Sequence, residues 1–360
     1  MARRVAFNDT KEYNKTFASG FADDLRAVLE SGRYILGDEV GHFEAKAAAY
    51  IGTKHCVSVS SGTTALEVAF RALQLQPDDE VILPANCYIA CALGALASGA
   101  KLVPVDCNDD ATLNIDMVEQ AVTPRTRAVL VVHLYGDCCD MDRLVSVCNT
   151  RSLALVEDCA QSFGSTYRGK KLGSFGVISC HSFYPTKNLG SIGDAGGIFT
   201  DSDSIARWCR AHRNLGSAEK YKHDIIGTNA RMDTLQAAFL ARKLDDIDSF
   251  VSRKRATAAM FTAALGDLHL RSNNPDVYHT YHLYVLRVKD RDAFCKRMAA
   301  LGIETIIHYP TPYYKNDPFK HLGLSFPMTE ALADSIVSIP LHLCMSNEDI
   351  QYIIQSVRSS

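Results

Sequence analysis

The feature that most constrains the fold is an alternation of short apolar runs with helical patterns between residues 55 and 200. Runs rich in β-branched residues predict seven buried strands, at 55–59, 81–84, 102–106, 128–136, 153–158, 177–183 and 196–200. Helical spacing of apolar residues predicts helices between several of them, at 62–75, 89–99 and 115–122. This alternation is typical of an α/β structure with a mostly parallel sheet, which binds ligands at the carboxyl ends of its strands.

The pattern changes after residue 230. Apolar residues keep helical spacing over 232–265, which predicts one long connecting helix. Beyond it, 278–288 alternates like a half-buried strand, and 291–303 and 347–357 have helical patterns. We therefore predict two domains, a large α/β domain over 1–248 and a smaller α+β domain over 249–360.

Composition and charge exclude several classes of function. The 38 basic and 41 acidic residues give a formal net charge of -3, and no basic cluster suits a nucleic acid. No run approaches the ~20 apolar residues of a membrane span, so we expect a cytoplasmic protein. The 12 cysteines include no C-x-x-C pair, and Cys87 and Cys91 lack a second pair of metal ligands. We expect reduced, buried thiols and no metal site.

Three segments at strand ends carry complementary polar groups. Ser61, Gly62 and Thr63 follow a strand and open a helix, where unpaired N–H groups favour a phosphate, although a plain helix cap fits them as well. Glu157 and Asp158 end another strand, either as caps or as partners of a cation.

The third segment, "HSFYPTKNLGSIGDAGG", places Lys187 between a turn and a glycine-rich run. Inside a cleft such an amine would have a lowered pKa and would condense with aldehydes, whereas on the surface it would be an ordinary loop lysine. Together the three segments offer a phosphate site, an acid for a protonated ring nitrogen and an imine-forming amine. Pyridoxal 5'-phosphate needs these three functions.

The motifs "SGTTAL", "EDCAQSFGS", "SFYPTKNLGSIGDAGG" and "GTNARMDTLQAA", in this order, resemble the DegT/DnrJ/StrS family of pyridoxal-phosphate-dependent nucleotide-sugar aminotransferases. The resemblance extends from about residue 33 to residue 314. It implies the aspartate-aminotransferase fold, known as fold type I. It also implies L-glutamate as the amino donor, pyridoxamine phosphate as the intermediate form of the cofactor, and a homodimer with shared active sites.

The resemblance also implies roles for the residues that would bind the cofactor. Lys187 would be the Schiff-base lysine, and Asp158 would face the pyridine nitrogen. Gln161 would lie near the 3-hydroxyl of the cofactor, and Tyr88 would stack on its ring unless it is an ordinary core tyrosine. The phosphate would be held by Gly62, Thr63 and Ser182, with Asn229 reaching over from the second subunit.

Further residues would face the sugar. Tyr184, His308 and Tyr309 match positions that line the substrate side in similar enzymes, although His308 fits a structural role nearly as well. Members that act as dehydratases carry histidine in place of Lys187, so the lysine favours transamination. The segments around Lys187 are similar to those of members that aminate carbon 3 of dTDP-linked 3-keto-6-deoxyhexoses.

Three alternatives to this hypothesis remain. The first is the same transamination at carbon 4 of a dTDP- or UDP-linked 4-keto-6-deoxyhexose. The second is a pyridoxal-phosphate-binding regulator without turnover, for which the sequence offers neither a DNA-binding segment nor a spoiled site. The third is a nicotinamide dehydrogenase, which lacks support because "SSGTTAL" is not a G-x-G-x-x-G turn.

Overall fold

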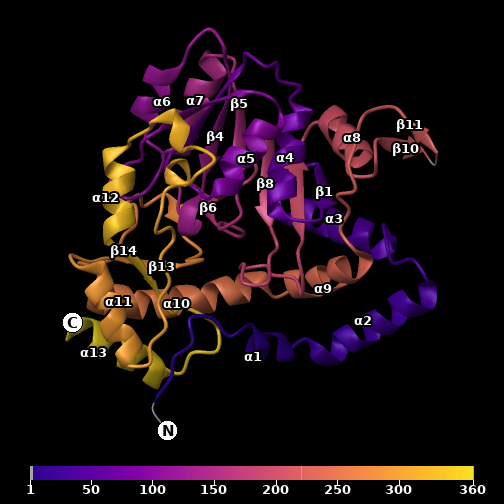
Figure 1. Ribbon diagram of the computed structural model, residues 1–360. Helices are drawn as coiled ribbons and strands as arrows, with labels where there is room; N and C mark the ends of the chain where they lie inside the picture. The colour runs from indigo at the N-terminus through magenta and orange to yellow at the C-terminus, as the bar shows by residue number, and fades with distance from the viewer. Residues whose placement is uncertain (1–2, 220, 360) are drawn as a thin grey trace.

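The computed structural model describes residues 3–219 and 221–359, with a seven-stranded sheet at its centre (Figure 1). One strand runs antiparallel to both of its neighbours, and the other six run in one direction. This confirms the predicted, mostly parallel sheet. In spatial order the strands are β1 (His55–Val59), the antiparallel β9 (Gly196–Thr200), β8 (Ile178–Ser182), β5 (Ala154–Asp158), β4 (Thr126–Val132), β2 (Glu80–Pro84) and β3 (Lys101–Val105).

The predicted strands agree with these bounds within about two residues, with one exception. The strand predicted over 128–136 ends as β4 at Val132, and Leu134–Gly136 forms the 3-10 turn η1. Tyr135 in this turn has a φ of 63°, a left-handed conformation that cannot continue a strand. The chain therefore leaves the sheet at the edge where the carboxyl ends of the parallel strands lie.

Successive side chains of a strand point to opposite faces of the sheet, and here both sets are apolar. Helices therefore cover both faces. In β2, Val81 and Leu83 join one apolar cluster, whereas Ile82 joins another on the opposite face. The first face is covered by α4 (Gly62–Ala72), α5 (Ile89–Ala97) and α8 (Asp203–His212). The second is covered by α6 (Ile115–Ala121), α7 (Met141–Thr150) and α3 (Asp38–Ile51).

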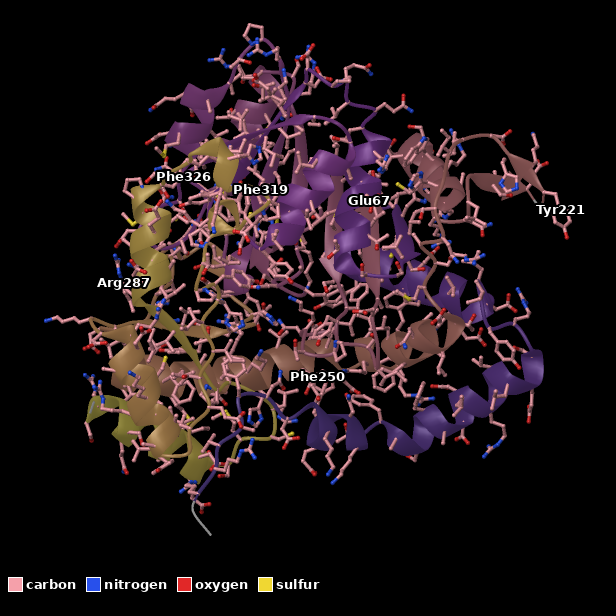
Figure 2. The ribbon with its side chains drawn as sticks, in the orientation of Figure 1. Glu67, Tyr221, Phe250, Arg287, Phe319 and Phe326 are labelled. Atoms are coloured by element: carbon pink, nitrogen blue, oxygen red, sulfur yellow. The ribbon has the colours of Figure 1, made fainter. Side chains whose placement is uncertain are left out.

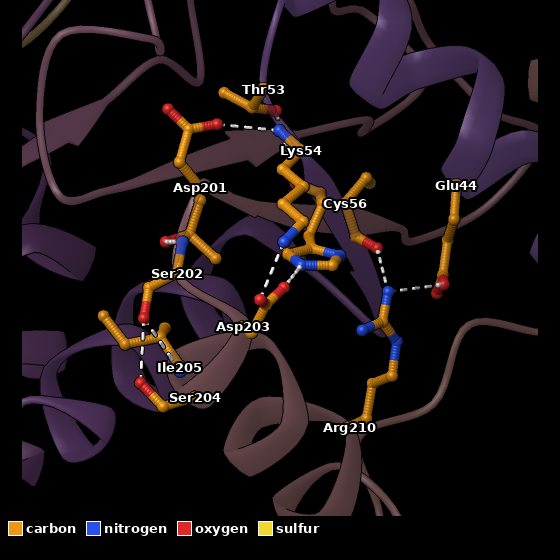
Figure 3. A network of polar contacts seen from close by, with 12 residues as sticks. Glu44, Thr53, Lys54, Cys56, Asp201, Ser202, Asp203, Ser204, Ile205 and Arg210 are labelled. Atoms are coloured by element: carbon orange, nitrogen blue, oxygen red, sulfur yellow. Dashed lines mark hydrogen bonds and ion pairs between the residues drawn. The ribbon is translucent and has the colours of Figure 1, made fainter.

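Polar contacts tie α8 and α3 to the β1 edge of the sheet (Figure 3). Asp203, in the first turn of α8, accepts hydrogen bonds from Lys54 at 2.7 Å and from His55 at 2.6 Å. Arg210, further along α8, donates to the carbonyl of Cys56 at 3.2 Å and lies 3.8 Å from Glu44 of α3. These contacts fix the edge strand β1, which pairs with β9, and they fix the start of α8, which follows β9 in the chain.

The long helix predicted over 232–265 is wrong, because two helices replace it. They are α9 (Thr234–Leu244) and α10 (Ile247–Leu265), which lie end to end beneath the sheet in Figure 1. The break falls at Asp245 and Asp246, and Asp246 has a φ of -102° and a ψ of 0°. Aspartate side chains compete for backbone N–H groups and favour helix ends. The N-terminal helices α1 (Thr10–Lys15) and α2 (Ala18–Ser31) run below α9.

After α10 the chain builds a second core around a two-stranded antiparallel sheet. The strand predicted over 278–288 is only partly correct, because β13 is confined to Tyr284–Arg287 and Tyr281 has a φ of 49°. The other elements are β14 (Ile336–Ile339), α11 (Arg291–Ala300), α12 (Pro327–Ser335), α13 (Asn347–Arg358), η2 (Tyr313–Lys315) and η3 (Lys320–Leu322). The domain boundary near residue 248 stays a prediction.

Two small sheets complete the structure. β12 (Val277–Tyr278) pairs with β6 (Thr166–Tyr167), which pairs with β7 (Lys170–Lys171), so the chain beyond α10 returns to the large unit. β10 (Ser217–Glu219) and β11 (Lys222–His223) form a pair that projects from the body of the molecule (Figures 1 and 2). Within residues 3–219 and 221–359, no helix is both long and apolar enough to cross a bilayer.

Candidate active site

A cavity of about 410 Å³ lies at the carboxyl ends of β5 and β8 and at the start of α4. Its volume is in the range of small-molecule sites. Ten of the residues predicted from the sequence to form the site line it: Gly62, Thr63, Tyr88, Asp158, Gln161, Ser182, Tyr184, Lys187, His308 and Tyr309. The cavity thus brings together side chains from both halves of the chain.

Lys187 lies on a tight turn after β8. Its N–H donates to the carbonyl of Tyr184 at 2.8 Å, and a side chain at Gly190 would collide with the carbonyl oxygen of Pro185. Burial lowers the pKa of the Lys187 amine, and the negative charge of Asp158 opposes this shift. The turn therefore presents a buried amine to the cavity, with a larger neutral fraction than a surface lysine has.

Asp158 ends β5 and is buried, and both of its carboxylate oxygens accept hydrogen bonds. The N–H of Ala160 donates to Oδ1 at 2.9 Å, and the thiol of Cys91 donates to Oδ2 at 3.0 Å. A buried carboxylate beside a cavity suits a positively charged partner within it. This geometry favours the interpretation of Asp158 as the partner of a cation over its interpretation as a cap.

The neighbouring acid, Glu157, points away from this cavity and has a structural role. It is fully buried, and it accepts hydrogen bonds from the N–H groups of Gly173, Phe175 and Gly176 at 2.7 to 2.8 Å. Its Oε2 also lies 3.0 Å from Nε2 of His133. Burial alone would raise the pKa of Glu157, but these partners outweigh it and lower the pKa.

The start of α4 has the form of an anion site. Ser61 is the N-cap, and its Oγ accepts the N–H of Thr64 at 3.1 Å, so the first turn begins beside the cavity. A Cβ at Gly62 would lie 2.6 Å from Cβ of Ser182, so only glycine lets the two segments approach this closely. The unpaired N–H groups of a first turn and the helix dipole favour a phosphate. Ser61 is therefore a helix cap as well as part of this arrangement.

Polar and aromatic side chains enclose the rest of the cavity. Gln161 accepts the N–H of Tyr135 at 2.7 Å and donates to the hydroxyl of Tyr309 at 3.1 Å. The ring centroids of Tyr88 and Tyr309 are 5.2 Å apart, and Tyr88 is 52% exposed, which argues against an ordinary core tyrosine. His308 contacts Ser338 through Nδ1 at 2.9 Å, and burial lowers its pKa to about 4.

Asn229 lies outside this cavity. It forms an isolated β-bridge with Asn214, and its Oδ1 accepts a hydrogen bond from Nε of Arg231 at 3.1 Å. Its side chain is exposed. The expected contact with a second subunit's phosphate site stays a prediction.

Sequence reasoning missed four ionisable residues that line the cavity: Cys180, His181, Asp194 and His282. Asp194 lies in the glycine-rich run after Lys187, and the motif "GDAGG" could have indicated it. His282 is buried, and its pKa is lowered well below the ordinary value by burial and by Lys187 and Lys254. Its segment alternates like a strand, which pointed to packing and gave no sign of a site.

One cluster among the described residues has donor atoms close enough for a metal ion: His133, Glu157 and Cys159. The hydrogen bonds that Glu157 accepts already occupy its oxygens. Burial and the nearby Glu157 raise the pKa of the Cys159 thiol well above its ordinary value, which disfavours the thiolate that a metal needs. The cluster is better explained as a hydrogen-bonded support for β5.

The donor set of the cavity fits pyridoxal 5'-phosphate. The first turn of α4 suits the phosphate, the buried amine of Lys187 suits the aldehyde, and the carboxylate of Asp158 suits the protonated ring nitrogen. The exposed face of Tyr88 offers a surface for ring stacking.

Comparison with known proteins identifies the family. Residues 16–358 match the model of the DegT/DnrJ/EryC1/StrS aminotransferase family. The chain belongs to this family. It is a pyridoxal-phosphate-dependent aminotransferase, as the sequence resemblance implies. A solved relative, the putative sugar aminotransferase Spr1654 from Streptococcus pneumoniae in its PLP form, is 26% identical with a TM-score of 0.90, over 99% of this chain and 98% of that one.

Relatives act on nucleotide-linked sugars. The dTDP-3-amino-3,4,6-trideoxy-alpha-D-glucose transaminase of Streptomyces venezuelae is 40% identical, covering 99% of this chain and 96% of the relative. The dTDP-3-amino-3,6-dideoxy-alpha-D-galactopyranose transaminase of Aneurinibacillus thermoaerophilus is also 40% identical, covering 98% of each chain. GDP-perosamine synthase of Escherichia coli O157:H7 is 33% identical, covering 89% of this chain and 90% of the relative.

The crystal structure of DesV from S. venezuelae, in complex with a ketimine intermediate, has a TM-score of 0.96 and 40% identity, over 99% of this chain and 98% of that one. This similarity confirms the predicted fold type I. The printed names of the relatives differ in nucleotide and sugar, so the family alone leaves the substrate of this chain open.

Proposed function

We propose that this aminotransferase transfers the amino group of L-glutamate to carbon 3 of a dTDP-linked 3-keto-6-deoxyhexose, giving a dTDP-3-amino-3,6-dideoxyhexose. The observation that carries the proposal is the meeting of Lys187 and Asp158 in one cavity beside an anion site. Two relatives at 40% identity are named as transaminases of dTDP-3-amino sugars, which supports both the nucleotide and the position.

The bound cofactor would supply an electron sink for the electrons released when a carbon–hydrogen bond next to its nitrogen breaks. Gly62, Thr63 and Ser182 would hold the phosphate, and Tyr88 would cover one face of the ring. Asp158 would keep the ring nitrogen protonated. Gln161 would face the 3-hydroxyl while its amide stays fixed by Tyr135 and Tyr309.

Lys187 would move the proton in both half-reactions. Its Nζ would take a proton from the alpha carbon of glutamate and deliver it to the carbon on the cofactor side of the same nitrogen. With the ketosugar, Nζ would move the proton in the opposite direction. Burial supports this role because a neutral amine is the base. The buried walls around the amine also limit the access of water.

Tyr184, His308 and Tyr309 would contact the sugar from the open side of the cavity. The active enzyme would be a homodimer in which Asn229 of one subunit approaches the phosphate site of the other. A regulator without turnover has less support, because the cavity keeps both Lys187 and Asp158. Amination at carbon 4 is the remaining alternative for the substrate.

Product analysis separates these substrates. The purified protein would be incubated with L-glutamate and with a panel of dTDP-3-keto-, dTDP-4-keto- and UDP-4-keto-6-deoxyhexoses, and the products would be analysed by mass spectrometry and NMR. We expect the amino group at carbon 3 of a dTDP-sugar. Exclusive amination at carbon 4, or preference for a UDP-sugar, would contradict the proposal, and Lys187→Ala protein provides the blank.

A further inference from the structure

A thiol from a different element holds the carboxylate of Asp158. Cys91 lies in the first turn of α5 and is fully buried, and its Sγ donates to Oδ2 of Asp158 at 3.0 Å. The N–H of Ala160 donates to the other oxygen, Oδ1, at 2.9 Å. One oxygen is thus held from the turn that follows β5, and the other from the helix that covers the sheet.

The backbone of Asp158 is already fixed by the sheet. The N–H of His133 donates to its carbonyl at 3.0 Å, and the next residue, Cys159, donates its N–H to the carbonyl of Cys180 at 2.8 Å. Only the side-chain torsions of Asp158 remain free. A single hydrogen bond from Ala160 fixes one oxygen, whereas the second bond from Cys91 also fixes the plane of the carboxylate.

The environment keeps the thiol a donor. Contact with Cys87 and burial raise the pKa of Cys91 well above its ordinary value, and the charge of Asp158 acts in the same direction. The thiol therefore keeps its proton at neutral pH. Because S–H is a weak donor, it orients the carboxylate and leaves most of the negative charge available to a partner in the cavity.

We propose that Cys91 is a positioning residue, whose thiol fixes the plane of the Asp158 carboxylate beside the cavity. The proposal rests on the proposed function, because the orientation matters only if Asp158 faces the ring nitrogen of the cofactor. Cys91 itself does not touch the substrate or the cofactor in this account, and it acts only through Asp158.

Cofactor binding tests the proposal without relying on turnover. Apo-protein would be titrated with pyridoxal 5'-phosphate and followed by its visible absorbance, and the pH titration of that band would be recorded for each variant. Cys91→Ala and Cys91→Val remove the donor, and valine also fills the space. We expect both to raise the dissociation constant by up to about tenfold, the upper end for the loss of one ordinary hydrogen bond, because S–H is a weak donor. Cys91→Ser keeps a donor and should stay within about threefold of the wild type.

Cys148→Ala is the matched control. Cys148 is equally buried, but it lies in α7 and packs on the opposite face of the sheet. We expect this variant to bind as the wild type does and to leave the pH titration unchanged. Thermal unfolding of each apo-protein would show that the variants are folded, and if the alanine variant does not fold, the valine and serine pair decides.

Three results would overturn the proposal: wild-type binding by Cys91→Ala and Cys91→Val, an equal loss in Cys148→Ala, or no recovery in Cys91→Ser. A wild-type protein that fails to bind pyridoxal 5'-phosphate would instead overturn the proposed function. The two failures are therefore distinguishable in one set of titrations.

Discussion

At the scale of single residues, the proposed chemistry depends most on Lys187. Replacing it with alanine removes the buried amine from the cavity. We expect Lys187→Ala protein to lose the visible absorbance of the lysine-bound cofactor and to lose turnover by at least ~1,000-fold, because the base is gone. Absorbance spectra and a glutamate half-reaction assay measure both effects.

Lys171→Ala is the control for this variant. The pKa of Lys171 is also lowered by burial, but its amine contacts the hydroxyl of Tyr50 at 2.9 Å and does not line the cavity. Its spectrum and turnover should match those of the wild type. Formation of aminated sugar by Lys187→Ala protein would exclude the assigned role.

Asp158→Asn tests the charge at the ring nitrogen. The amide keeps the size of the side chain but removes its negative charge, so the variant should still bind the cofactor and turn over about 100-fold more slowly. Steady-state kinetics with glutamate measure the change. Glu157→Gln is the neighbouring control, and it should lower the midpoint of thermal unfolding while the folded protein keeps its spectrum. Equal turnover in Asp158→Asn and the wild type would argue against the electron-sink role.

These two neighbours also show what the sequence could predict of the site. Motifs were enough to select Lys187, Asp158 and the start of α4 as candidates. Adjacent residues of a strand point to opposite faces, so Glu157 and Asp158 had to differ in role, but which face carries the cavity depends on the helices that cover it. His282 could not be predicted, because it reaches the cavity through folding of a segment far along the chain.

At the scale of elements, the end of α9 supports the lysine turn. Lys243 is fully buried, and its Nζ donates to the carbonyl of Gly190 at 2.7 Å, three residues after Lys187. Burial lowers the pKa of Lys243 to about 7. Above that pH the native state holds a neutral amine, whereas the unfolded chain keeps its proton up to about pH 10.

A pH dependence of stability follows from this lysine. Between pH 7 and about 8.5 the unfolded state binds more protons than the native state, so the free energy of unfolding should rise with pH, by at most ~1.4 kcal/mol per unit from this group. In Lys243→Met that contribution should disappear. Denaturant unfolding of both proteins at pH 7.0 and 8.5 tests this, and an equal slope in the two proteins would contradict it.

Helices and strands could be predicted where the apolar pattern of the sequence matches the burial and the ends of the element in the folded structure. The inner strands β2, β4 and β5 are largely buried on both faces, so their apolar runs identify them in the sequence. The break between α9 and α10 was missed because the apolar spacing continues across Asp245 and Asp246. The end of β4 was missed for a similar reason, since Leu134 and Tyr135 are apolar but belong to a turn.

At the scale of the whole molecule, the segment around β10 and β11 projects from the body and carries exposed apolar side chains. Tyr221 is 85% exposed and Ile226 is 95% exposed, and Tyr221 lies far from the body of the molecule in Figure 2. Exposed apolar side chains that form a contiguous patch are typical of sites of protein association. Asn229 follows on the same segment, is exposed and does not line its own cavity, which is compatible with the proposed contact with a second subunit.

Mixing two inactive variants tests whether the active sites are shared. Lys187→Ala removes the base, and Asn229→Asp places a negative charge where the partner's phosphate would lie. In a mixed dimer, one site carries both changes and the other carries neither, because Lys187 and Asn229 of that site come from different subunits. Random reassociation should therefore restore about a quarter of the wild-type activity. Mass spectrometry would first show that mixed dimers have formed. If the activity of the mixture then stays at the sum of the activities of the two variants, Asn229 contributes to the site of its own subunit or to no site.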